Sequence, residues 1–117
     1  MTIQECYQAL GGDWEEVLGR LYSEALVCKF AGKFLSDPSF QLLEDSVNEG
    51  SWEDAFRAAH TLKGVSQNLS FTRLYQSSHE ITEALRTKDY DLAKLLLPKV
   101  QEDYAKTVGA IREFQGE

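Results

Sequence analysis

Hydrophobic residues recur at intervals of three and four along almost the whole chain, and the alternation of apolar and polar residues that marks strands is nearly absent. Only Pro38 and Pro98 would interrupt helices by removing a backbone donor. The connections between helical segments are short, which makes consecutive helices antiparallel neighbours. The pattern predicts an all-α protein, a single domain over residues 1–117. Its architecture is an antiparallel up-down four-helix bundle with additional short N-terminal helices.

Short helices are predicted in the N-terminal third. One covers about Ile3–Leu10 and ends at a pair of glycines. Asp13 is a favourable N-cap for the next helix, with the sequence WEEVLGRL. The amphipathic segment Tyr22–Leu35 either continues this helix or follows a break near Gly19. The inward-facing residues of that segment are expected to be Leu26, Phe30, Phe34 and Leu35.

Longer helices follow the stop at residues 36–38. The first covers about Ser39–Asn48. Ser51 is the predicted N-cap of the second, with Asp54 in a near capping box, and this helix runs to about Leu69.

Thr72 is the predicted N-cap of the third long helix, and residues 87–89 connect it to the last, Tyr90–Phe114, where Pro98 is expected to introduce a kink. In the third helix the predicted inward-facing residues are Leu74, Tyr75, Ser78, Ile81, Thr82 and Leu85. In the last helix they are Leu92, Leu95, Leu96, Val100, Tyr104, Val108 and Ile111.

The composition excludes some functions. The formal net charge of −7 argues against nonspecific nucleic-acid binding, which depends on basic residues that neutralise phosphates. No apolar run is long enough to span a bilayer, and the N-terminal segment lacks the features of a secretory signal. We therefore expect a cytoplasmic protein without nucleic-acid or membrane partners. Cys6 and Cys28 form no CxxC motif and are expected to be buried thiols.

Four residues of the second long helix share one face. Lys63, Gly64 and Gln67 follow His60 at i+3, i+4 and i+7, spacings that place all four along one stripe. We call these four residues the His60 stripe. The nearby apolar residues fall mostly on the other side: Phe56, Ala59, Leu62, Val65 and Leu69. An exposed histidine beside a glycine that costs roughly 0.5–1 kcal/mol in a helix indicates that something approaches here.

The His60 stripe has the chemistry of a phosphoryl acceptor. An exposed imidazole is a nucleophile near neutral pH, because its reference pKa is about 6.5. Lys63 can stabilise the charge of a phosphoryl group, Gly64 leaves room for a partner, and Gln67 offers neutral donors. A lone histidine on a helix is more often an ordinary surface or core residue, and the HxxKG spacing alone recurs by chance.

The sequence AAHTLKGVSQNL over residues 58–69 resembles the signature of histidine phosphotransfer (HPt) domains. The wider layout is similar to this family as well, in the GGD of residues 11–13, the WED of residues 52–54 and the Leu-Arg pair at 85–86. The resemblance implies that His60 is phosphorylated, with Lys63 and Gly64 in supporting roles. It implies a free-standing phosphoryl carrier rather than an enzyme, and no glycine loop or kinase signature for ATP is present.

The resemblance also implies the partners. HPt domains take a phosphoryl group from an aspartate of one receiver domain, or from a histidine kinase, and pass it to another receiver. The chain itself is expected to bind no cofactor, and the Mg²⁺ of the reaction is expected on the receiver. Arg57 lies one turn before His60 and, with Gln67, is expected to contact the partner. The first helix either adds apolar contact area or closes the core.

Two positions depart from the family pattern. Ser70 stands where many members have a glycine at the helix end, and its effect should be local. Thr82 stands where members often have a carboxylate or amide that holds the unphosphorylated ring nitrogen of the histidine, so the resemblance makes Thr82 the candidate orienting group. His79, one turn earlier, is either a residue near the phosphoryl group or an exposed polar residue.

Two other functions remain open from the sequence. An adaptor with the HPt shape would bind a receiver or kinase domain without carrying phosphate. A metal-binding bundle would use His60, His79, Cys6 and Cys28, but their spacing matches no compact metal motif.

Overall fold

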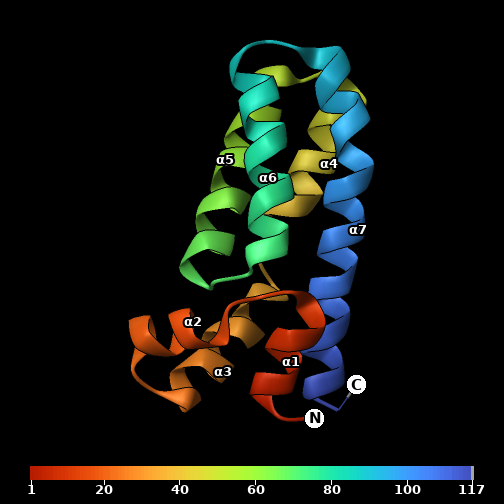
Figure 1. Cartoon of the computed structure of the whole chain (residues 1–117). Helices are drawn as coiled ribbons and strands as arrows, with labels where there is room; N and C mark the ends of the chain where they lie inside the picture. Colours follow the sequence, from red (N-terminus) through yellow and green to blue (C-terminus); the bar gives the residue numbers. More distant parts are fainter. Residues whose placement is uncertain (117) are drawn as a thin grey trace.

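Four long helices of the computed structural model run antiparallel as a bundle, and three shorter ones lie across one end of it (Figure 1). The structure describes residues 1–116, which contain helices and no strand. The short helices are α1 (Ile3–Leu10), α2 (Trp14–Leu21) and α3 (Glu24–Phe34). The bundle consists of α4 (Ser39–Glu49), α5 (Trp52–Asn68), α6 (Thr72–Arg86) and α7 (Tyr90–Phe114). The predicted fold class is confirmed; the end of the predicted domain at Glu117 lies outside the described residues.

The order of the bundle helices follows from the short connections between them. In the bundle α5 packs against α4 and α6, and α7 packs against α6 and α4. The longest helix, α7, continues past the bundle to pack against α1, so both chain ends lie at the same end of the molecule (Figure 1). Within the described residues, no helix is both long and apolar enough to cross a lipid bilayer.

The N-terminal helices begin and end close to where the sequence predicts. The Oγ1 atom of Thr2 and the carboxylate of Glu5 form a capping box at the start of α1, and Asp13 caps α2 through a hydrogen bond from the N–H of Glu16. The break after α2 falls at Tyr22, in the left-handed region with φ 62°, rather than near Gly19. Ser23 then caps α3.

Some of the predicted helix caps and inward-facing residues differ in the structure. Ser51 occupies the predicted N-cap of α5, but its side chain makes no capping hydrogen bond. Thr72 is not the N-cap of α6, because Phe71 occupies that position. Leu26 and Leu92 are about two-fifths exposed, and Leu95 is 76% exposed. The face of α7 that is buried in the core is instead defined by Ala93, Leu97, Val100, Val108 and Ile111. The helix continues through Pro98 to Phe114.

The α1–α2 connection is fixed to the α5–α6 connection by backbone hydrogen bonds. The N–H of Asp13 donates to the carbonyl of Ser70, at 2.9 Å, and the N–H of Arg73 donates to the carbonyl of Gly11, at 3.1 Å. The hydroxyl of Tyr7 donates to the carbonyl of Leu69, at 2.8 Å. A Cβ at Gly12 would lie 2.7 Å from the carbonyl oxygen of Ser70, so only glycine fits there. These contacts hold the C-terminal end of α5.

Candidate functional site

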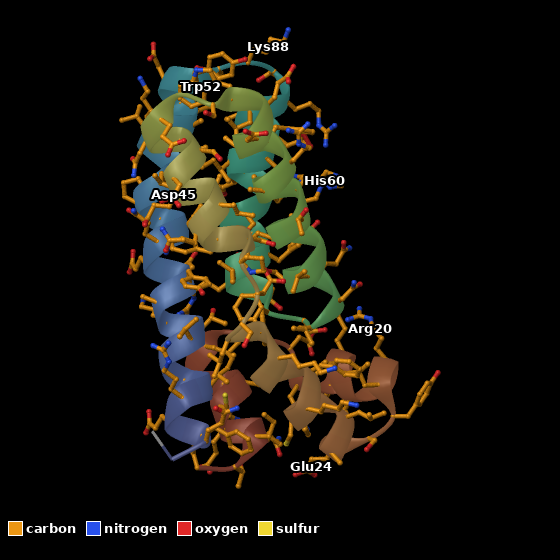
Figure 2. All side chains as sticks on the ribbon, turned by 180° about the vertical axis from the view of Figure 1, so that it is seen from behind. Arg20, Glu24, Asp45, Trp52, His60 and Lys88 are labelled. Atoms are coloured by element: carbon orange, nitrogen blue, oxygen red, sulfur yellow. The ribbon has the colours of Figure 1, made fainter. Side chains whose placement is uncertain are left out.

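His60 is the ninth of the seventeen residues of α5, and its side chain projects into solvent midway along the helix (Figure 2). Its neighbours Ala59 and Leu62 are fully buried and fix which face of α5 turns inward. The ring of His60 lies 5.9 Å, between centroids, from the ring of Phe56 one turn earlier. Within residues 1–116 the imidazole makes no hydrogen bond, so it is free to react.

The other members of the His60 stripe lie on the same outer face. Gln67 is exposed, and Lys63 and Gly64 are half-exposed. A Cβ at Gly64 would meet no atom within 4 Å, so the packing of this chain does not require glycine there. The predicted exposed stripe is therefore confirmed, and the open space beside His60 is available to another molecule.

Arg57 lies one turn before His60 and is exposed. Its guanidinium pairs with the carboxylate of Asp54 on the same helix. The hydroxyl of Thr61 donates to the backbone carbonyl of Arg57, at 3.0 Å. Because an exposed ion pair contributes little, the Arg57 side chain can exchange Asp54 for an acidic group of a partner.

A charged pair on α6 adjoins the site and was missed from the sequence. The Cζ of Arg86 lies 5.0 Å from the ring centroid of Phe56, the same ring that His60 contacts. Its Nε donates to the Oε2 of Glu83, at 2.9 Å. This hydrogen bond is the main reason that the pKa of Glu83 lies below its ordinary value, and the charges of Arg86, His79 and Lys63 lower it further. The sequence offered two signals, the i,i+3 spacing of the pair and the place of Arg86 in the family layout, but neither indicated the contact with Phe56.

Thr82 does not orient the ring of His60 in this structure. Its side chain is fully buried, as predicted for an inward-facing residue, and its hydroxyl donates to the backbone carbonyl of Ser78 at 2.6 Å. A threonine in a helix interior readily makes this bond to the carbonyl one turn earlier, and within the described residues its hydroxyl makes no hydrogen bond to α5.

His79 is half-buried on α6. Its ring lies 5.9 Å from the ring of Tyr75, at an interplanar angle of 18°. Its Nδ1 is buried and has no hydrogen-bond partner. No hydrogen bond or ring contact joins it to His60 within the described residues. The charges of His79 and Lys63 both lower the pKa of Glu83.

The cysteines and the first helix belong to the core. Cys6 is fully buried and Cys28 half-buried, and both thiols are free. Ile3, Tyr7 and Leu10 are at most 2% exposed, so α1 closes the core and does not offer apolar area to a partner. Among residues 1–116, no three His, Cys, Asp or Glu side chains are grouped to hold a metal ion.

Comparison with known proteins identifies one related family. The family model of the Hpt domain matches residues 35–110, which include α4, α5, α6 and most of α7. No curated protein and no solved structure matches the chain. The matched part contains the His60 stripe, Arg57, and the Glu83–Arg86 pair, whereas α1–α3 lie before it.

Proposed function

The chain belongs to the Hpt domain family, whose members carry phosphoryl groups on histidine in two-component phosphorelays, and we propose that His60 is the residue phosphorylated here. The observation that carries the proposal is the free imidazole of His60 on the outer face of α5, next to open space above Gly64. Of the two histidines in the chain, His79 is half-buried and lacks such an approach.

The proposed reaction takes the phosphoryl group from a receiver aspartate. A nitrogen of the neutral ring attacks phosphorus, a P–N bond forms, and the P–O bond to the aspartate breaks. The aspartate leaves as a carboxylate with the electron pair of that bond, and the phosphorylated ring then loses its N–H proton to solvent. Transfer to a second receiver reverses these steps. The receiver supplies Mg²⁺, and this chain supplies a positioned nucleophile.

Cations near His60 support the same assignment. A phosphohistidine carries nearly two negative charges, and Lys63 is one helical turn away. Arg86 reaches the Phe56 ring that His60 contacts and is held there by Glu83. We propose that the phosphoryl group draws Arg86 away from Glu83, since a surface pair of this kind is weak.

Labelling by a phosphorylated receiver domain tests the proposal. The wild-type protein should acquire a phosphoryl group that is labile in acid and stable in base, as a phosphohistidine is, and should pass it to a second, unphosphorylated receiver. His60→Gln should acquire none while keeping its helicity. Binding of the receiver without any labelling of the wild type would instead identify an adaptor and refute the carrier function.

A further inference from the structure

A hollow of about 440 Å³ lies between the α2–α3 hairpin and the last turns of α5. Its walls are apolar and come from all three helices, with Leu21 from α2, Phe30 and Phe34 from α3, and Val65 and Leu69 from α5. This volume falls within the range of about 300–1,000 Å³ that is typical of sites for small molecules. Arg20, at its edge, lies beside the end of α5 in Figure 2.

Two of the three charged residues that line the hollow are basic. Lys33 lines it and makes no ion pair within residues 1–116; its ammonium lies 5.5 Å from the ring centroid of Phe30. Arg20 also lines it, but its guanidinium is bonded to the end of α5. The acidic residue here, Asp37, keeps its negative charge, and its carboxylate accepts a hydrogen bond from the N–H of Ser39 at 2.8 Å.

We propose that this hollow binds a small amphipathic anion, with an aliphatic or aromatic body against the apolar walls and a carboxylate or sulfonate at Lys33. The concave shape favours a small molecule over a protein surface, and the two basic residues against one acidic residue favour an anion. Val65 lies five residues after His60 on α5, so a bound ligand sits beside the His60 stripe and not on it. The proposal requires neither phosphorylation nor a receiver.

Fluorescence titration of the unphosphorylated protein with 8-anilinonaphthalene-1-sulfonate tests it. We expect saturable binding of one probe per chain, displaced by decanoate at lower concentrations than by decanol. Lys33→Glu should weaken probe binding about fivefold, because it reverses the charge at the head group. Lys29→Glu is the matched control; Lys29 is an exposed lysine of the same helix that also lies near Phe30 but does not line the hollow, and its replacement should leave binding unchanged.

A second variant distinguishes probe binding in the hollow from probe binding elsewhere on the surface. Val65→Phe places a ring in the hollow and should abolish probe binding in protein whose circular dichroism stays helical. The proposal is wrong if binding is not saturable, if both lysine variants weaken it equally, or if Val65→Phe binds as wild type does. The proposal is also overturned if the wild-type protein does not bind the probe and Lys33→Glu slows phosphoryl transfer from a receiver. That result would assign the hollow to a protein partner.

Discussion

The packing around α5 does not require a glycine at position 64. A Cβ at this position would meet nothing within 4 Å, and the same holds for Gly109 on the exposed face of α7. Both lie within regular helix, where glycine costs about 0.5–1 kcal/mol relative to alanine. The fold requires neither glycine. If replacement of Gly64 impairs function and replacement of Gly109 does not, the cause is a molecule that approaches α5.

Replacement of each glycine by leucine separates stability from function. We expect Gly64→Leu and Gly109→Leu to raise the free energy of unfolding by similar amounts, about 0.5–1 kcal/mol in urea denaturation. Only Gly64→Leu should slow phosphoryl acceptance from a receiver, by at least about tenfold, because it displaces the reacting groups. An unchanged transfer rate in Gly64→Leu would show that the space beside His60 is not used.

At the scale of elements, α5 is held at its C-terminal end by α2. The Nη1 of Arg20 donates to the carbonyls of Gln67 and Asn68 and to the Oγ of Ser70, and this Oγ donates to Glu16 at 2.7 Å. Ser70 adopts φ 55°, a conformation that favours glycine. This explains the departure from the family pattern noted in the sequence: the serine is strained, but its hydroxyl joins α2 to the end of α5.

Substitutions at Ser70 measure these two opposing effects. Ser70→Ala keeps the positive φ and loses both hydrogen bonds of the buried hydroxyl, so the free energy of unfolding should fall by about 1–3 kcal/mol. Ser70→Gly loses the same bonds but removes the strain, and should be more stable than the alanine variant by about 1 kcal/mol. Equal stability of the two variants in urea denaturation would mean that the left-handed backbone carries no cost.

The packing of α1 against α3 and α7 makes stability sensitive to alkaline pH. Burial raises the pKa of the Cys6 thiol from 9.0 to about 11, and the charges of Cys28 and Glu113 act in the same direction. A folded-state pKa above the unfolded value means that the contribution of the neutral thiol is complete below pH 9 and is lost as the pH rises through 11. Burial raises the pKa of Tyr7 as well.

We therefore expect the free energy of unfolding to fall between pH 8 and pH 10. In Cys6→Ala this fall should be smaller by about 1 kcal/mol, because one titrating group has been removed. Urea denaturation at the two pH values measures the difference between the proteins, which includes the part of the raised Tyr7 pKa that comes from the charge of Cys6. The same fall in both proteins would show that Cys6 does not control the alkaline loss.

For the whole molecule, the sequence predicted the order of the helices because apolar periodicity is a local property, but it left open whether α2 and α3 are one helix or two. The bounds of α1, α2 and α7 agree with the structure. The periodicity did not decide which leucines of α7 face inward, since that segment is apolar on several sides and only the packed neighbours select the buried face. Leu95, 76% exposed, is the clearest example.

The residues of the candidate site were likewise predicted only in part. The His60 stripe was found from spacing, because all its members lie on one helix. The contact of Arg86 with Phe56 depends on how α6 packs against α5, and spacing along one chain segment carries no such information. The resemblance made Thr82 the candidate orienting group for His60, but in this structure its hydroxyl donates to Ser78 and no hydrogen bond joins it to His60. Single-helix features were predictable, and features between helices were not.

The chain has only two histidines, and this allows a direct test of whether His60 is the residue that is phosphorylated. His60→Gln and His79→Gln each leave one, and both are incubated with the same phosphorylated receiver and followed by intact-protein mass and acid lability. The account predicts acid-labile phosphorylation of His79→Gln at the wild-type extent and none of His60→Gln. Labelling of His60→Gln, or loss of labelling in a folded His79→Gln, would contradict it.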